Sequence, residues 1–585
     1  MYTHGSFRPV ALTLRLVVVI LFLVMTNQGV IQRIDVLYNR DNIIFLYGFA
    51  VLWAICLVAI AAAAFHPSVL VRSLWAMLIG ASTASALAFQ HASQSELGML
   101  DVLSLWNSRH EATRAVEFYT PSLYWIAAAM LTSVLVIAAP PSLDIRTNSR
   151  LRLAMGSLPL IPISLITMTI FLKDGGGFNG LPVQFTPLSI GIASAWTLAT
   201  HSAPARRAVT WAAAGPPVRS IVLLIDESVR GDYIDLTDGN PYTPSLAQHK
   251  GRLVDFGPAS SGGNCSHYSN AILRFIASPP TIGRDLLSHP TIWQFAKNAG
   301  YRTVFIDAQA GFIRNKGQLQ NFMTLDEMKY IDSYRAIDGS TPAHSLDDTL
   351  LDILLEELQS GQPAFIYANK NGAHFPYDRN YPETERKFRP VMSEAGDQVA
   401  TRVNSYRNAI WWTVDRFFDR LFRATSLKDT VIIYTSDHGQ VLRPGRLSHC
   451  SIEEPDPREA LVPLFVATDD EGLRSRFGSA ATIQRGQASH FSIGPTALEL
   501  MGYSVADITE LSTASLLPQN VRTPDATPSR FTTGDIFALF TSRTRWHDID
   551  LHASYLEAPP PASKGFGANR LPDGILNGYA GDIRN

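Results

Sequence analysis

Carboxylate and imidazole side chains recur in the second half of the chain, at positions where they could bind a metal ion. Short apolar runs lead directly into Asp226 and Glu227, and into Asp437 and His438. A third such run precedes His374, and His449 lies downstream of His438. Mixed oxygen and nitrogen ligands suit zinc better than magnesium or manganese, because imidazole is a poor ligand for harder ions. The pattern predicts a metal-dependent site, with one or two zinc ions as cofactor.

A candidate nucleophile lies in the stretch SGGNCSHYSN, residues 261–270, where two glycines precede Cys265 and Ser266. A hydroxyl beside a metal ion becomes a competent nucleophile toward phosphorus. A metal-bound cysteine would instead form a thiophosphate link, which suits such a transfer less well. We therefore expect Ser266 to be the nucleophile, with Cys265 as the alternative.

The elements that must position these residues are typical of a doubly wound α/β domain. Runs of β-rich apolar residues fit strands buried on both faces of a mostly parallel sheet. Helical patterns lie between them, at 291–300 and 345–361. Ligands in such sheets bind beyond the carboxyl ends of the strands. Each candidate alone could be a helix cap, a turn or a packing residue, but together they favour one site. The predicted strands are 220–226, 301–307, 363–369, 429–437 and 462–468.

The first 172 residues have the composition of a membrane domain. The charged fraction of the chain is 17%, below the roughly 25% of soluble domains. Residues 43–64 carry no charge and are long enough to cross a hydrocarbon core of about 30 Å as a helix. We expect five transmembrane helices. The other four apolar runs are 14–30, 74–89, 123–139 and 153–172.

Basic residues in the short loops predict the orientation of these helices. Arg8 and Arg15 accompany the first run, and Arg146, Arg150 and Arg152 lie between the fourth and the fifth. Both regions are then cytoplasmic. An odd number of spans places the remaining chain outside, in the periplasm of a Gram-negative cell.

A further apolar run, 183–199, would reverse that conclusion if it crossed the membrane, but it contains Gln184 and Pro187. We expect it to form an interfacial helix. The predicted domains are a transmembrane domain over 1–172, an interfacial or bridging segment over 173–216, and a periplasmic α/β catalytic domain over 217–585. The net charge of −2 gives no support for nucleic-acid binding.

The segments LIDESVRGD, SGGNCSHYSN, NGAHFPY and SDHG with a later histidine, following five predicted helices, resemble the lipid-linked phosphoethanolamine transferases. These belong to the alkaline phosphatase and sulfatase superfamily. The resemblance implies a zinc ion bound by Glu227, Ser266, Asp437 and His438. It gives His374 and His449 a role in binding the phosphoryl group or a second metal. The chain departs from the family at Ser266, where threonine is typical, and at Gln309, near a substrate-contacting asparagine. Asp226 and His490 are weaker site candidates.

The same resemblance implies a reaction at the bacterial inner membrane, catalysed by a multi-pass protein. Phosphatidylethanolamine would donate phosphoethanolamine to Ser266, and a glycolipid or glycan such as lipid A or the lipopolysaccharide core would accept it. The alternatives are a phosphoglycerol transferase, a sulfatase-like hydrolase, or an inactive lipid-binding regulator. Sulfatases need a Cys-x-Pro-x-Arg pattern, which Cys265 lacks.

Family members in the periplasm usually carry several disulfides. The chain has three cysteines, and Cys56 lies in an apolar run. A bridge between Cys265 and Cys450 is the remaining hypothesis.

Overall fold

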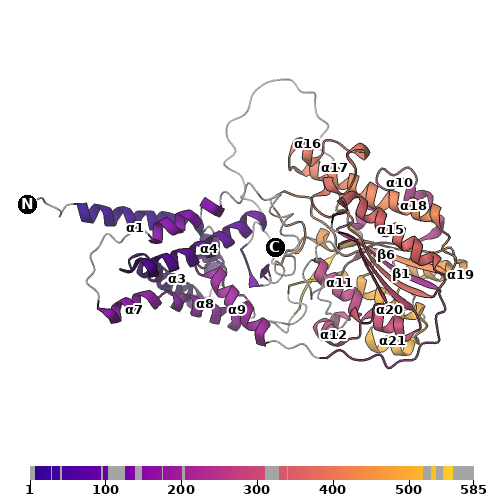
Figure 1. Ribbon diagram of the computed structural model, residues 1–585, viewed down its shortest axis with the longest axis horizontal. Helices are drawn as coiled ribbons and strands as arrows, with labels where there is room; N and C mark the ends of the chain where they lie inside the picture. The colour runs from indigo at the N-terminus through magenta and orange to yellow at the C-terminus, as the bar shows by residue number, and fades with distance from the viewer. Residues whose placement is uncertain are drawn as a thin grey trace, which may run out of the picture.

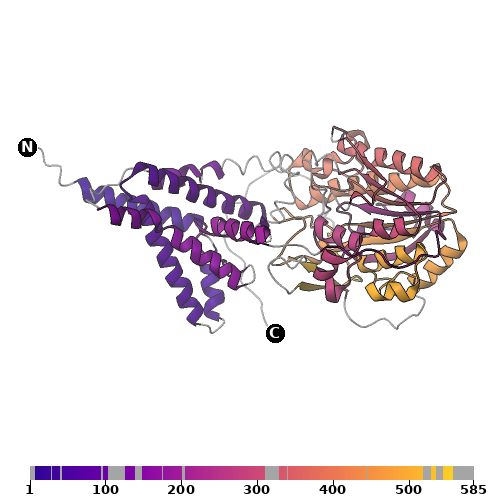
Figure 2. The same ribbon diagram turned by 60° about the horizontal axis from the view of Figure 1, so that its bottom comes forward.

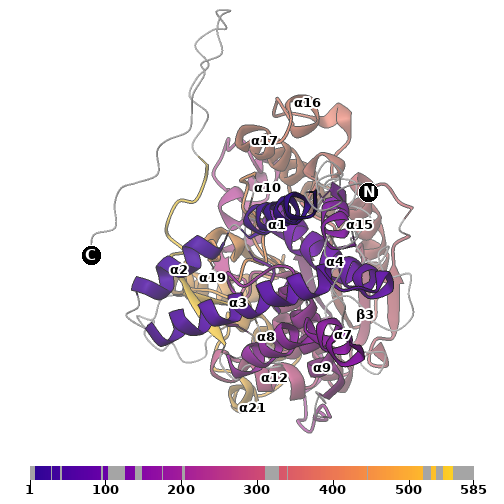
Figure 3. The ribbon, with the colours of Figure 1, turned by 90° about the vertical axis from the view of Figure 1, so that its left-hand side faces the viewer.

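The computed structural model divides into a part built of apolar helices and an α/β part, which lie end to end along the long axis (Figures 1 and 2). The turned view of Figure 3 places the apolar helices in front of the α/β part. The residues that the structure describes are 7–27, 29–39, 43–93, 96–99, 101–102, 126–128, 130–138, 148–173, 176–200, 205–309, 328–338, 340–444, 446–452, 454–517, 529–534 and 544–557.

Three helical stretches among the described residues are long and apolar enough to cross a membrane: Ile44–Ala64, Val69–Gln90 and Ser149–Leu172. Two shorter apolar helices, Leu16–Thr26 and Ile126–Ala138, coincide with the remaining predicted runs. Their apolar lengths fall short of the roughly 20 residues that a span needs. Three of the five predicted spans are therefore supported by length and composition. The helices are α1 (Phe7–Thr26), α2 (Val30–Asn39), α3 (Ile43–Ala64), α4 (Val69–Ser93), α7 (Ser149–Ser157), α8 (Leu160–Leu172) and α9 (Thr186–Thr200).

The run predicted to be interfacial contains α9, which packs against α8 and α4. The Ser189 hydroxyl donates to the carbonyl of Ile163 at 3.1 Å. Gln184, just before α9, is fully buried and donates to Thr26 Oγ1 at 2.9 Å while accepting from Asn27 Nδ2 at 3.1 Å. These contacts make the segment part of the helical bundle. That it lies along the membrane surface stays a prediction.

The α/β part is built on a seven-stranded sheet with the order β2-β7-β6-β1-β5-β3-β4. All five predicted strands are present, and the sheet is mostly parallel. The exception is β7, which runs antiparallel to both β6 and β2. The strands are β1 (Ser220–Asp226), β2 (Leu253–Ser260), β3 (Arg302–Asp307), β4 (Ser333–Ala336), β5 (Ala364–Asn369), β6 (Thr430–Ser436) and β7 (Leu461–Ala467).

Helices cover both faces of this sheet, as the alternation of strand and helix predicts (Figure 1). One apolar core includes residues of α13, α20 and α21, and a second core on the other face includes residues of α15, α17 and α18. The helices are α10 (Pro244–Gln248), α11 (Ser266–Phe275), α12 (Ile282–Ser288), α13 (Ile292–Asn298), α15 (Ala343–Gln359), α16 (Met392–Ala395), α17 (Val399–Ile410), α18 (Phe417–Ala424), α19 (Glu471–Gln484), α20 (Ile493–Leu500) and α21 (Val505–Leu511).

Two further strands, β8 (Ser529–Thr533) and β9 (Arg545–Ile549), form a separate antiparallel pair. This pair contacts the glycine-led turn before α11. The backbone N–H of Thr532 donates to the carbonyl of Gly262 at 2.8 Å. The hydroxyl of Ser260 donates to the carbonyl of Arg530 at 2.8 Å. The C-terminal strands thus support the turn that carries the candidate nucleophile.

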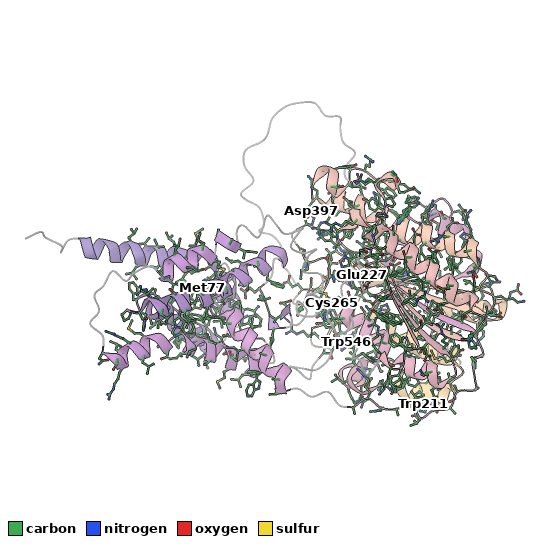
Figure 4. The ribbon with its side chains drawn as sticks, viewed as in Figure 1. Met77, Trp211, Glu227, Cys265, Asp397 and Trp546 are labelled. Atoms are coloured by element: carbon green, nitrogen blue, oxygen red, sulfur yellow. A yellow bond between two sulfur atoms is a disulfide. The ribbon has the colours of Figure 1, made fainter. Side chains whose placement is uncertain are left out.

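Residues 205–216 connect the helices to the sheet and pack on the α/β part. The guanidinium of Arg206 lies 3.8 Å from the centre of the Phe275 ring, at the end of α11, and donates to the carbonyl of Leu286 at 2.8 Å. Trp211 contacts the rings of Phe295 and Tyr503, at the edge of the α/β part in Figure 4. The end of the predicted bridging segment is therefore attached to the α/β part.

Candidate metal centre

Glu227, Asp437 and His438 converge just beyond the carboxyl ends of two neighbouring parallel strands. Glu227 follows β1, and the other two follow β6, with which β1 pairs in register. The His438 Nε2 atom lies 3.3 Å from Glu227 Oε1 and 3.6 Å from Asp437 Oδ2. One potential ligand atom from each residue lies within 4.8 Å of the others, and all three side chains are buried. The geometry is that of a compact metal-binding group.

The hydrogen bonds of Asp437 and His438 leave one possible metal-ligand atom on each side chain. Asp437 Oδ2 is buried and has no hydrogen-bond partner, an arrangement that costs free energy unless a cation or ligand compensates it. The Nδ1 atom of His438 lies 2.7 Å from the carbonyl of Gly439, which makes Nδ1 a hydrogen-bond donor, so Nε2 is the ring nitrogen that could bind a metal. Two carboxylates and one imidazole nitrogen fit zinc.

The electrostatics of the group also favour a cation. Burial and the negative charge of Glu227 raise the pKa of Asp437 to about 8. Burial opposes protonation of His438, but the two carboxylates raise its pKa to about 9. Burial would likewise raise the pKa of Glu227, yet the charge and hydrogen bond of His438 hold it below its usual value. A bound divalent cation would relieve this repulsion between buried carboxylates.

Ser266 is the first residue of α11, and its Oγ atom lies 3.1 Å from His438 Nε2. The N-terminus of a helix presents free N–H groups and a positive dipole, which favour a phosphoryl group there. The turn before it requires glycine at Gly262, because φ is +73° and a Cβ would lie 2.8 Å from the Phe491 ring. The local fold therefore presents the hydroxyl to the metal-binding group.

Cys265 and Cys450 form a disulfide, which confirms the hypothesis of that bridge. The sulfur of Cys265 is consequently bonded to another sulfur and has no free thiol. This bond argues against Cys265 as the nucleophile. Among the described residues, Cys56 is the free cysteine, and it is buried in α3.

His449 and His374 lie beside the metal-binding group without joining it. The ring of His449 stacks on that of His438, with centres 4.0 Å apart and an angle of 21° between the planes. His374 follows Ala373, whose N–H donates to the carbonyl of Glu227 at 2.9 Å. The charge of His374 contributes to the low pKa of Glu227, after the effects of burial and His438. Both histidines are only partly buried.

Gln309, Asp226 and His490 occupy different positions around this centre. The side-chain amide of Gln309 donates to Glu227 Oε2 at 3.2 Å and to the carbonyl of Lys370 at 2.7 Å. Asp226 is engaged by the Lys370 ammonium at 2.5 Å and by the Tyr434 hydroxyl at 2.9 Å. The Nε2 atom of His490 lies 3.1 Å from Thr435 Oγ1, and burial lowers its pKa to about 3. Gln309 therefore contacts the metal-binding group, whereas Asp226 and His490 are not part of it.

Several residues at the site were not found by sequence reasoning. Lys370 is fully buried, and its position directly after the apolar run of β5 was an available signal. Gln440 lies 3.3 Å from His449 Nδ1 through its Oε1 atom. The side-chain amide of Asn264 donates to Glu459 Oε2 at 2.7 Å. No local pattern pairs Asn264 with Glu459, because nearly two hundred residues separate them.

Comparison with known proteins finds a family model that matches much of the α/β part. Residues 219–503 match the family model described as Sulfatase. The chain carries a Sulfatase-family domain. Its matched range contains every residue of the metal-binding group together with Ser266, His374 and His449. No curated protein matches the chain in sequence.

One solved structure shares the fold, and another is similar over the α/β part at a lower score. The integral membrane protein lipooligosaccharide phosphoethanolamine transferase A (EptA) from Neisseria meningitidis aligns with a TM-score of 0.61 and 18% identity, over 85% of this chain and 98% of that one. The C-terminal periplasmic domain of EptC from Escherichia coli, in a complex with Zn, aligns with a TM-score of 0.45 and 19% identity, over 59% of this chain and 96% of that domain. The first match extends the fold likeness from the α/β part to the N-terminal helices.

Proposed function

We propose that this protein is a membrane-bound, zinc-dependent phosphoethanolamine transferase. The observation that carries the proposal is the convergence of Ser266 with Glu227, Asp437 and His438 at one sheet edge. The Sulfatase-family domain and the fold shared with the Neisseria protein support the choice of phosphoryl chemistry. Helices able to cross a membrane account for access to a lipid donor.

The proposed first half-reaction forms a covalent enzyme. Ser266 Oγ attacks the phosphorus of phosphatidylethanolamine in line and loses its proton. The bond between phosphorus and the diacylglycerol oxygen breaks, and diacylglycerol leaves after taking up a proton. Zinc bound by Glu227, Asp437 and His438 would lower the pKa of the serine hydroxyl and neutralise charge on the phosphoryl oxygens. His374 and His449 bind and orient the phosphoryl group.

The second half-reaction returns the site to its starting state. A hydroxyl or phosphate oxygen of a glycolipid or glycan, such as lipid A or the lipopolysaccharide core, attacks the same phosphorus. The bond between phosphorus and Ser266 Oγ breaks, and the serine regains its proton. The proposed location is the inner membrane with the α/β part in the periplasm, where a donor phospholipid and an envelope acceptor both occur.

The test compares Ser266→Ala with Ser269→Ala in whole cells supplied with head-group-labelled phosphatidylethanolamine. Ser269 lies in the same helix, and its hydroxyl donates only to the carbonyl of Cys265, at 3.0 Å. Loss of the nucleophile should reduce labelling of the glycolipid by roughly 10³-fold or more, whereas Ser269→Ala should retain most of it.

The outcome also separates the alternatives. Labelling from a glycerol-labelled phosphatidylglycerol in place of ethanolamine would identify a phosphoglycerol transferase. Release of label into water without an acceptor would identify a hydrolase. Purified protein that is folded, contains no zinc and transfers nothing would identify a lipid-binding regulator.

A further inference from the structure

The candidate nucleophile and the loop that carries His449 come from distant parts of the chain and are joined covalently. The disulfide links Cys265 to Cys450 across a sequence separation of 185. One half-cystine directly precedes Ser266, and the other directly follows His449. The bond therefore ties the two site residues through their immediate neighbours.

Hydrogen bonds beside the disulfide join the same two segments. The N–H of Cys450 donates to the carbonyl of Asn264 at 2.8 Å. The Asn264 amide donates to the carbonyl of Ser451 at 2.7 Å and to Glu459 Oε2 at 2.7 Å. Glu459 Oε2 also accepts from the N–H of Ser451 at 2.9 Å, and Glu459 is 1% exposed. A buried carboxylate with these partners holds the loop firmly, because unsatisfied buried charge is costly.

The described part of the loop also accepts hydrogen bonds from Arg402, to the carbonyl of Arg443 at 3.1 Å, and from Thr533 Oγ1, to the carbonyl of Ile452 at 3.4 Å. Residues 440–444 and 446–452 contain no helix or strand. By contrast, Glu227, Asp437 and His438 directly follow strands of the sheet and are positioned without this loop. The bonds to the turn before α11 are made by the two residues that directly follow His449, Cys450 and Ser451.

We propose that Asn264, Cys265, Cys450 and Glu459 form a clamp that positions His449 against His438 and Ser266 for phosphoryl transfer. This inference rests on the proposed function. The clamp closes a ring of contacts, since His449 stacks on His438 at 4.0 Å and His438 Nε2 lies 3.1 Å from Ser266 Oγ. A displacement of about 1 Å in a positioned group can reduce a rate about 10²-fold. The clamp residues act through His449 and are positioning residues.

The first test is a double-mutant cycle that combines Cys265→Ser/Cys450→Ser with His449→Ala, and Cys56→Ala serves as the control that keeps the bridge. The bridge variant should lower kcat by about 10- to 100-fold with zinc content unchanged. In the His449→Ala background, removal of the bridge should change kcat less than about threefold, because coupled residues are not additive. Full additivity, loss of zinc, or unchanged kcat would each overturn the proposal.

The second test does not depend on the identity of the donor. Arg446 is exposed and lies in the clamped loop, so tryptic cleavage after it reports how firmly the loop is held. Dithiothreitol, applied to the folded wild-type protein, breaks the sulfur–sulfur bond to give two thiols and is itself oxidised to a cyclic disulfide. Reduction should accelerate this cleavage at least about tenfold, and Glu459→Gln should accelerate it less.

Equal cleavage before and after reduction would overturn the clamp proposal. This test needs no variant, so it applies even if Cys265→Ser/Cys450→Ser fails to fold. If reduction accelerates the cleavage but the protein transfers no phosphoethanolamine, the proposed function is contradicted. The role of the disulfide in holding the loop would still be established. The two failures are therefore distinguishable.

Discussion

Asp226 and Glu227 are neighbours in the chain, but their carboxylates have different partners. Successive side chains of a strand point in opposite directions, and the contacts follow that rule. Glu227 lies with Asp437 and His438. Asp226 lies with Lys370 at 2.5 Å, and Asp347 is 3.6 Å from the same ammonium. One carboxylate therefore belongs to the metal-binding group, and the other belongs to a buried ion cluster behind it.

Lys370→Met should destabilise the protein strongly, because it leaves the carboxylates of Asp226 and Asp347 buried without a cation. Removing one partner of a buried pair typically costs about 3–5 kcal/mol. Lys250→Met is the matched control, since Lys250 pairs with Asp238 in solvent, at 53% and 79% side-chain exposure, and such pairs contribute about 0–1 kcal/mol. Thermal unfolding in detergent should show a much larger fall in Tm for Lys370→Met. Equal falls would contradict this account of the ion cluster.

Residue types at strand ends could be predicted from the sequence, but their exact partners could not. Glu227, Asp437 and His438 were all expected at one sheet edge, because apolar runs end just before them. The separation of Asp226 from that group depends on Lys370, which no pattern pairs with it across 144 positions. Gln309 is expected near a substrate, which stays a prediction, and its hydrogen bond to Glu227, 82 positions away, could not be predicted from the sequence.

At the scale of elements, the glycine-led turns position the site loops. Gly372 has φ of +55°, and a Cβ there would lie 2.1 Å from Asp226 Oδ1 and 2.6 Å from the carbonyl of Glu227. This close approach brings the loop carrying His374 against the strand end that carries Glu227. Only a residue without a side chain allows that packing.

Gly372→Ala should therefore displace the His374 loop and reduce transfer, with a loss of stability of about 1–3 kcal/mol from overpacking added to backbone strain. Gly239→Ala is the control, because Gly239 has a similarly positive φ of +78° but nothing lies within 4 Å of its Cβ position. Comparing the activity and Tm of the two variants separates the effect of the close contact from the effect of backbone strain alone. If both lost activity equally, the loop would not depend on this contact.

Two strands of the seven-stranded sheet, β2 and β4, were missed by sequence reasoning for identifiable reasons. In β2 the apolar pattern is broken by Gly257 and Pro258, where the register shifts against β7. The sequence of this strand therefore has the pattern of a turn. β4 is only four residues long and lies at the edge of the sheet. The antiparallel direction of β7 could not be predicted, because hydrophobic periodicity indicates which residues are buried but not which way a strand runs in the sheet. Contacts of β8 with the nucleophile turn join residues 270 positions apart.

At the scale of the whole molecule, the site lies toward the helices. In Figure 4, Glu227 and Cys265 are at the end of the α/β part nearer to the apolar helices. The chain that leaves those helices places Arg206 on Phe275 of α11, the helix that begins with Ser266. This arrangement suits a lipid donor that reaches Ser266 from the membrane.

The predicted topology can be tested with two exposed positions. Glu471→Cys lies at the start of α19 in the α/β part, and Ser149→Cys lies at the start of α7, in the region predicted to be cytoplasmic. A membrane-impermeant maleimide should label Glu471→Cys in intact spheroplasts and label Ser149→Cys only after lysis. Labelling of both positions only after lysis would show that the segment 183–199 crosses the membrane, and labelling of Ser149→Cys alone in intact spheroplasts would show that the predicted orientation of the helices is wrong.

The most direct test of the central claim is mass spectrometry of the covalent intermediate. Purified, zinc-loaded protein is mixed with vesicles of phosphatidylethanolamine without an acceptor, quenched in acid and digested. We predict phosphoethanolamine on the peptide that contains Ser266, and no adduct after Glu227→Gln or Ser266→Ala. An adduct on another residue, or none on zinc-loaded wild-type protein that releases diacylglycerol, would contradict the account.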